Sequence, residues 1–190
     1  MNKVLTVESR LEFDTCFHLE YSPDISFIEA QPEGFYYPYQ DKHLPYTPDF
    51  LIVDKGKRKL IEVKPFKKTQ SLEFQQCFLA KKEQANELDI SLILVTEKQI
   101  RVDPILNNLK LLHRYSGFQS LTSLHMSFIE IAKRYQRIKV KDFVSFCGVD
   151  ESIAIATTLR LISSGLLCMN LSTQDFNLDS IVWCNDHEKS

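Results

Sequence analysis

The segment YTPDFLIVDKGKRKLIEVKPFKK, residues 46–68, contains two apolar runs joined by a short polar turn. Runs of this kind predict two β-strands, and a Gly in the turn predicts a hairpin because Gly readily takes a positive φ. If the turn is centred on the Lys-Gly pair of DKGK, Asp49 lies opposite Glu62 on one face of the hairpin, and Lys64 shares that face. A three-residue loop with a Gly bulge would shift this pairing by one residue.

These three side chains predict a hydrolytic site. Two adjacent carboxylates repel each other unless a cation lies between them, and oxygen ligands of this kind suit Mg²⁺ or Mn²⁺. A neighbouring lysine stabilises charge on a phosphate or positions a water molecule. The pattern therefore favours metal-assisted hydrolysis of a phosphodiester.

A purely structural interpretation of the same residues is also open. Asp49 suits a turn after Pro48, and Glu62 and Lys64 suit the solvated face of an edge strand. Against this interpretation, Glu62 lies within the apolar run LIEV, where an unpaired buried acid is costly.

The composition is that of a globular protein. The chain has 190 residues, of which 44% are hydrophobic and 25% are charged, so it has enough apolar residues for a main core and a second small domain. The net charge of -2 neither requires nor excludes nucleic acid, although lysines crowd the hairpin segment. The five cysteines are scattered, and we recognise no signal peptide and no membrane-spanning run, which predicts a cytoplasmic protein with reduced thiols.

The first half of the chain predicts alternating strands and helices. The apolar run ISLILVTE is typical of a strand that is buried on both faces, so we expect helices on both sides of the sheet. Leu11 and Phe17 are expected to be buried in the first helix, and Phe74, Phe78 and Leu88 to form the apolar side of the second. The expected elements are a helix over 8–19, a strand over 25–31, an irregular or edge segment over 32–48, hairpin strands over 49–53 and 59–63, a helix over 71–88 and a strand over 90–97.

The alternation ends near residues 113–120, which predicts a boundary between a domain over residues 1–118 and a second domain over residues 119–190. Three helices followed by a β-hairpin are expected in the second part, and this is the order of a winged helix. The expected elements are helices over 121–135, 140–147 and 150–165, a turn at Gly148, and strands over 166–171 and 180–184.

The third helix of this tail is poorly suited to reading DNA. It carries Asp150 and Glu151 at its start against a single Arg160, whereas major-groove readers present basic and amide side chains there. Trp183 in the last strand suits either an interface or the core. A basic group that could contact a DNA backbone or an acidic partner lies earlier and comprises Lys133, Arg134, Arg137, Lys139 and Lys141. We therefore expect a protein-docking module.

The motif residues resemble those of a known nuclease family. Pro48-Asp49 followed by Glu62-x-Lys64 resembles the PD-(D/E)xK nuclease motif. The stretches ESRLEFDTCFHLEYSPDISFIEAQP, YTPDFLIV, LIEVKP and LILVTEKQI resemble the TnsA family, the endonuclease subunit of heteromeric Tn7-like transposases. The resemblance covers residues 8–101, and the winged-helix-like tail is similar to the second domain of that family.

The resemblance implies an α/β fold, in which a restriction-endonuclease-like PD-(D/E)xK domain is followed by a C-terminal winged-helix-like domain. It implies cleavage of double-stranded DNA at the 5′ ends of the transposon with Mg²⁺ or Mn²⁺, while a TnsB-type transposase cuts the 3′ ends. It also implies that the C-terminal domain docks on a TnsC-type AAA+ regulator. We therefore expect a metal-dependent DNA endonuclease that works with these partners.

The resemblance further implies the roles of individual residues. The catalytic set is Glu12, Asp49, Glu62 and Lys64, and the metal ligands are Asp49, Glu62, the carbonyl of Val63 and Glu12. Because some members of the family have Gln at the Glu62 position, direct metal binding by Glu62 is an open question. Glu12 has a structural alternative, since Ser9 and Glu12 have the spacing of a capping box. Glu8, one turn earlier on the same helix face, is the alternative third acid.

Contacts to DNA phosphates are expected from lysines near the motif. Lys67 and Lys68 follow it directly, and Lys57 and Lys59 belong to the basic run of the hairpin, which is more often a solvated turn. Two other functions fit the same residues. One is a restriction or repair nuclease of the same fold that acts without a transposase, and the other is a non-catalytic adaptor that uses the fold only for docking.

Overall fold

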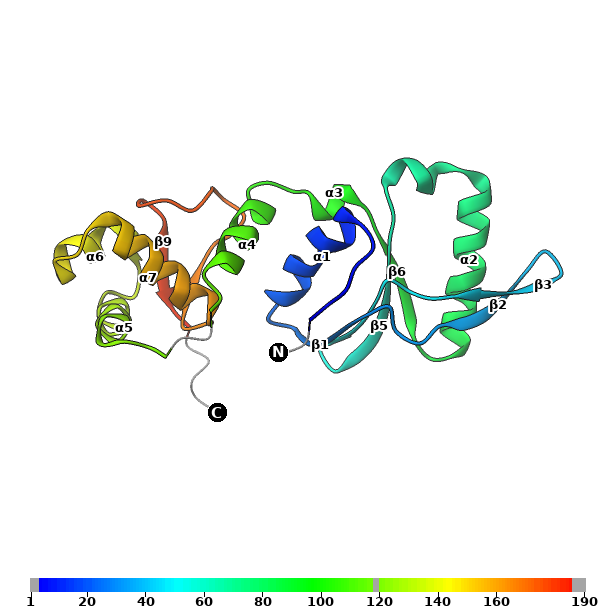
Figure 1. The fold of residues 1–190 in the computed structure, drawn as a ribbon, viewed down its shortest axis with the longest axis horizontal. Coiled ribbons are helices and arrows are strands. Elements are labelled where there is room, and N and C mark those ends of the chain that lie inside the picture. The colour runs from blue at the N-terminus through cyan, green and yellow to red at the C-terminus, as the bar shows by residue number, and fades with distance from the viewer. Residues whose placement is uncertain (1–3, 118–119, 186–190) are drawn as a thin grey trace. The chain divides into compact units, whose positions relative to one another are not determined.

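The structure is a computed structural model that describes residues 4–117 and 120–185. The chain forms two compact units, which divide between Val102 and Asp103 (Figure 1). The division lies before the boundary near residue 118 that the sequence predicts, because the helix over residues 105–114 packs with a helix of the second unit. Loss of strand-helix alternation therefore marked the end of this helix and not the end of the first unit.

The first unit is built on a mixed four-stranded sheet with the order β1-β4-β5-β6. β5 and β6 are parallel, whereas β1, β4 and β5 form antiparallel pairs. A separate two-stranded sheet contains β2 and β3. The elements are α1 (Arg10–Glu20), β1 (Ile25–Ala30), β2 (Phe35–Tyr39), β3 (Lys42–Tyr46), β4 (Phe50–Asp54), β5 (Lys57–Val63), the 3-10 helix η1 (Phe66–Gln70), α2 (Leu72–Glu87), β6 (Ser91–Val95) and α3 (Glu97–Ile100).

The β4–β5 hairpin has the predicted register. Phe50 pairs with Ile61 and Asp54 pairs with Lys57, with no shift between them. The turn consists of Lys55 and Gly56, whose φ angles of 49° and 76° are both in the left-handed region. Successive positive φ values are typical of the two-residue turn that follows the twist of a hairpin. The even loop therefore brings Asp49 and Glu62 to the same end of the two strands.

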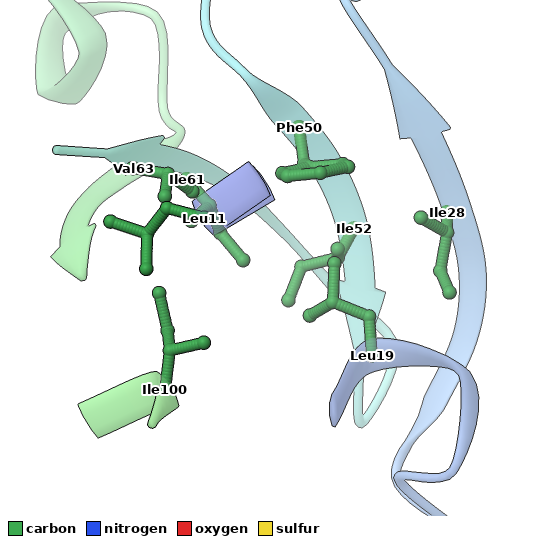
Figure 2. Packing of buried hydrophobic residues seen from close by; sticks show 8 residues of the cluster. All are labelled: Leu11, Leu19, Ile28, Phe50, Ile52, Ile61, Val63 and Ile100. Carbon is green, nitrogen blue, oxygen red and sulfur yellow. The ribbon is translucent and has the colours of Figure 1, made fainter. Parts of the chain in front are cut away.

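Both faces of the sheet are covered, as the sequence predicts. Strand residues alternate between the faces, so that Phe50 and Ile52 lie on one face and Leu51 lies on the other. Figure 1 shows α1 and α2 on opposite sides of the sheet. The core on the α1 side, drawn in Figure 2, comprises Leu11, Leu19, Ile28, Phe50, Ile52, Ile61, Val63 and Ile100. The core on the α2 side comprises Tyr37, Tyr46, Leu51, Leu60, Ala85 and Leu92.

Residues 32–48, which we expected to be irregular or edge structure, contain the β2–β3 hairpin. Its turn consists of Gln40 and Asp41, with φ angles of 49° and 57°. Pro38 and Pro45 fit because each strand of a two-stranded ribbon has one free edge, where a missing amide breaks no ladder hydrogen bond.

Two expectations about apolar residues were wrong. β6 is an edge strand of the sheet, and it buries Leu92 but leaves Ile93 38% exposed, so it is not buried on both faces. Leu88 lies at the C-cap of α2 and is 54% exposed, so it does not belong to the apolar side of that helix. Leu11 and Phe17 of α1 are buried as predicted.

The second unit contains four helices and a three-stranded antiparallel sheet with the order β7-β9-β8 in its described residues. Phe128 and Phe143 stack at 4.1 Å in its core and are fully buried. Gly148, with a φ of 63°, ends a helix at the predicted turn, and Asp150 caps the next one. The elements are α4 (Ile105–Arg114), α5 (Ser123–Tyr135), β7 (Ile138–Lys139), α6 (Val140–Cys147), α7 (Glu151–Ser163), β8 (Leu167–Met169) and β9 (Ile181–Cys184).

None of the helices in the described part of the chain combines the length and the apolar character that a membrane crossing requires.

Candidate active site

Asp49, Glu62 and Lys64 come together where β4 begins and β5 ends. The Lys64 Nζ lies 3.2 Å from Asp49 Oδ2 and 3.2 Å from Glu62 Oε1, so one ammonium bridges both carboxylates. The backbone amide of Val63 donates to Asp49 Oδ2 at 2.6 Å, and the amide of Lys64 donates to the carbonyl of Val95 at 3.1 Å. Backbone pairing of β5 with its neighbours therefore fixes the charged group.

The two carboxylates are buried, while the lysine reaches the surface. Asp49 and Glu62 are 7% and 3% exposed, and the side chain of Lys64 is 32% exposed. Burial raises the pKa of Asp49, although the amide of Val63 and the ammonium of Lys64 act in the opposite direction. Burial alone would lower the pKa of Lys64, but the charges of Glu62 and Asp49 raise it above its usual value. Lys64 therefore keeps its proton, and the site holds a permanent cation beside two acids.

Tyr46 and Lys81 complete this group, and the sequence did not point to either. The hydroxyl of Tyr46 donates to Glu62 Oε2 at 2.5 Å, and Lys81 Nζ lies 3.5 Å from Glu62 Oε1. Burial and the charge of Glu62 raise the pKa of Tyr46 far above its usual range, so its hydroxyl stays a donor. Tyr46 does precede Asp49 closely in the stretch YTPD, but no feature distinguishes Lys81 from the other lysines of α2.

Glu12 is occupied by the capping of α1. Its carboxylate accepts hydrogen bonds from the amide of Glu8 at 2.9 Å and from the hydroxyl of Ser9 at 2.7 Å, and the hydroxyl of Ser9 accepts from the amide of Glu12. Ser9 thus supplies one half of the expected capping box, whereas the Glu12 carboxylate binds the amide of Glu8 and not that of Ser9. Glu8 lies before the first residue of α1 and is exposed, so its expected place on the face of the helix was wrong. α1 packs against β5, with Leu11 in the same core as Val63 (Figure 2).

The expected DNA-binding lysines lie in two places. Lys67 and Lys68 are exposed on η1, directly after the charged group. η1 is held by its first residue, Phe66, whose amide donates to Glu97 Oε2 at 2.7 Å and whose ring lies 3.1 Å from Lys98 Nζ. These contacts attach η1 to α3.

Lys57 and Lys59 lie at the other end of β5. Lys57 lies five positions before Glu62, which corresponds to about 17 Å along an extended strand. Lys59 also forms an ion pair with Asp54 at 2.5 Å. These two lysines are therefore less suited to a phosphate at the charged group than Lys67 and Lys68 are.

The donor chemistry of the site fits a hard divalent cation. Asp49 and Glu62 supply carboxylate oxygens, and Mg²⁺ is commonly bound by one or two carboxylates together with water and substrate phosphates. The hydrogen bonds and the ion pair of the Asp49 carboxylate within the described part of the chain involve Oδ2, which leaves Oδ1 for a further ligand. Across residues 4–117 and 120–185, no three His, Cys, Asp or Glu side chains are already gathered for a metal.

Residues 22–97 match the family of the TnsA-like endonuclease N-terminal domain. These residues thus correspond to a TnsA-like endonuclease domain. The matched residues contain Tyr46, Asp49, Glu62, Lys64 and Lys81, and thus the whole charged group, whereas α1 and the second unit lie outside the match. A search of curated proteins found no match.

The match confirms the resemblance that the sequence showed. The mixed α/β fold with its four-stranded sheet is consistent with a TnsA-like nuclease domain. TnsA-like endonucleases typically depend on metal ions, which agrees with the carboxylate oxygens of the site. The domain therefore supports a nuclease role for the chain.

Proposed function

We propose that this chain is the metal-dependent DNA endonuclease subunit of a heteromeric transposase, which cleaves the 5′ ends of the transposon while a TnsB-type transposase cuts the 3′ ends. The observation that carries the proposal is the group of Asp49, Glu62 and Lys64 within the TnsA-like domain. A domain that served only as a docking platform would have no need for two buried acids at a strand end, because burying them is costly.

Asp49 is the principal ligand of Mg²⁺ or Mn²⁺ in this proposal, because within the described part of the chain its hydrogen bonds and its ion pair involve Oδ2 and not Oδ1. A metal bound there would polarise the scissile phosphate and generate a hydroxide nucleophile. Glu62, the carbonyl of Val63 and Glu12 stay predictions as further ligands. Glu12 would have to exchange its contacts with Ser9 for the metal.

Lys64 supplies a positive charge next to the metal ligand. Its ammonium is held by two carboxylates but is partly exposed, so it can approach a phosphate oxygen without leaving the site. Negative charge develops on the phosphate as the bond to the leaving oxygen breaks, and a fixed cation stabilises that charge. Lys67 and Lys68 would bind neighbouring phosphates and position the strand.

The second unit is assigned to partner docking as a winged-helix-like domain. From α5 onward, its order of helix, strand, two helices and two strands supports this, as does the pairing of β7 with β9. α7 begins with Asp150 and Glu151, which disfavours insertion into a DNA groove. Trp183 is half-buried beneath the guanidinium of Arg137 at 4.8 Å, so part of its ring remains accessible to a partner. A TnsC-type AAA+ regulator is the proposed partner.

Reconstitution with a partner transposase tests the proposal. A duplex that carries a transposon end, labelled on each strand in turn, is incubated with the transposase, Mg²⁺ and either the native chain or Lys64→Met. We expect the native chain to cut the 5′ strand and the variant to leave only the 3′ cut. Lys55→Met is the matched control, since Lys55 lies at the opposite end of the hairpin and pairs with Asp24.

The alternatives predict different results in the same assay. A restriction or repair nuclease would cut the duplex without the transposase and at other sites. An adaptor would promote the 3′ cut with no cleavage of its own, and Lys64→Met would then behave as the native chain does. Either result would refute the proposed function.

A further inference from the structure

Glu62 has a contact on both of its carboxylate oxygens. Oε2 accepts the hydroxyl of Tyr46 at 2.5 Å, while Oε1 lies 3.2 Å from Lys64 Nζ and 3.5 Å from Lys81 Nζ. The residue is 3% exposed, so water does not compete for these positions. An ionised carboxylate at this depth needs such partners, because an unpaired buried charge is strongly unfavourable.

Tyr46 and Lys81 are themselves held in place. The ring of Tyr46 packs edge-on against Phe35 at 5.2 Å and against Tyr37 at 6.3 Å. Lys81 Nζ lies 4.1 Å from the centre of the Tyr46 ring, and its side chain is only 14% exposed. A cation over an aromatic face is attracted by the ring electrons, so Tyr46 and Lys81 stabilise each other as well as Glu62.

The charges of the group are balanced without a metal. Asp49 and Glu62 contribute two negative charges, and Lys64 and Lys81 contribute two positive charges. The two acids differ in whether a carboxylate oxygen is left for a further ligand. In the described part of the chain, the hydrogen bonds and the ion pair of Asp49 involve Oδ2 alone, whereas those of Glu62 involve both oxygens. A metal could therefore reach Asp49 without breaking a contact, but it could reach Glu62 only by displacing Tyr46 or a lysine.

We propose that Tyr46 and Lys81 are positioning residues of the nuclease site, which hold Glu62 so that its carboxylate orients Lys64 and does not ligate the metal. This inference rests on the proposed function and withdraws Glu62 from its predicted metal ligands, leaving Glu62 as the residue that orients Lys64. It gives a role to two residues from outside the β4–β5 hairpin, since Tyr46 ends β3 and Lys81 lies in α2. The ribbon and the helix on this face of the sheet are thus connected to the catalytic lysine through one side chain.

Two measurements on the full chain distinguish this role from a merely structural one. The first is the affinity for Mn²⁺, titrated by the electron paramagnetic resonance signal of the free ion. We expect Asp49→Asn to bind Mn²⁺ at least about tenfold more weakly, and Glu62→Gln and Tyr46→Phe to stay within about threefold of the native chain. Equal losses in Glu62→Gln and Asp49→Asn would show that Glu62 is a direct ligand and would overturn the inference.

The second measurement is the rate of 5′-strand nicking of a transposon-end duplex at saturating Mn²⁺ in the presence of the partner transposase. Tyr46→Phe and Lys81→Met should lower kcat by about 10–100-fold, with little change in KM for DNA, because they act through the position of Lys64. Lys81→Arg should recover part of the rate, since it keeps the charge. Undiminished kcat in both Tyr46→Phe and Lys81→Met would overturn the inference.

Matched controls come from neighbouring positions. Tyr37→Phe removes a hydroxyl of the same core, where its partner is the sulfur of Cys77 at 3.0 Å, and Lys82→Met removes an exposed charge of the same helix. Both controls should keep the native kcat. If they lost as much kcat as Tyr46→Phe and Lys81→Met, the losses would reflect general destabilisation, and the inference would be refuted. If the native chain neither bound Mn²⁺ nor nicked DNA, the proposed function would fail and the inference with it. The comparison of Glu62→Gln with Asp49→Asn separates the two failures.

Discussion

Replacing Asp49 by Asn should strongly slow strand cutting and leave the fold intact. The amide oxygen of Asn can still accept the hydrogen bond from Val63, which measures 2.6 Å in the native chain. The substitution also removes a charge that burial disfavours, since burial raises the pKa of Asp49. We therefore expect the free energy of unfolding to change by less than about 1 kcal/mol. Loss of the metal should remove about 3–4 kcal/mol of transition-state stabilisation, which lowers the cutting rate by roughly 100–1000-fold.

Asp49→Ala provides the contrast. It leaves the buried amide of Val63 without its acceptor, which should cost about 1–3 kcal/mol of stability. Urea unfolding followed by circular dichroism measures the stabilities, and 5′-strand nicking of a labelled transposon-end duplex with Mg²⁺ and the partner transposase measures the rates. Asp54→Asn is the control, because Asp54 ends the same strand and pairs with Lys59 away from the site. Native nicking by Asp49→Asn, or equal destabilisation by Asn and Ala, would refute the reasoning.

Four further outcomes are expected. Phe50→Ala should lower the free energy of unfolding by about 3–5 kcal/mol in urea titrations, because Phe50 is fully buried in the core of Figure 2. The native chain should bind DNA weakly and without sequence preference, and combined replacement of Lys67 and Lys68 by Ala should reduce the slope of log K against log salt by about 1.8, as fluorescence anisotropy would show. Burial and the nearby charge of Glu12 raise the pKa of Cys16 to about 11 from 9.0, so the thiolate fraction of Cys16 at about pH 8 should be roughly 100-fold smaller than that of an ordinary thiol. Mass spectrometry should therefore find slow alkylation of Cys16 by iodoacetamide. Removal of residues 103–190 should leave Mn²⁺ binding unchanged but abolish capture by the AAA+ regulator in a pull-down.

The parts of the fold that the sequence predicted are those with a strong local signal. The DKGK turn and its apolar flanks predicted both the β4–β5 hairpin and its register. The β2–β3 hairpin escaped prediction because its turn, Gln40-Asp41, takes positive φ values without a Gly, and because its strands contain prolines. The exposure of Ile93 was also not predicted, since a run of apolar residues does not show whether a strand lies at an edge of its sheet.

The residues of the site also differ in whether the sequence could predict that they meet. Asp49, Glu62 and Lys64 lie on one hairpin, so the sequence by itself determined their meeting once the two-residue turn fixed the pairing of the strands. Tyr46 and Lys81 reach Glu62 from a ribbon and a helix that pack on the sheet from elsewhere in the chain, and only the tertiary structure decided this. The reason is physical: a turn is set by the backbone preferences of a few adjacent residues, whereas the contacts of a helix with a distant strand depend on how a whole apolar face is buried.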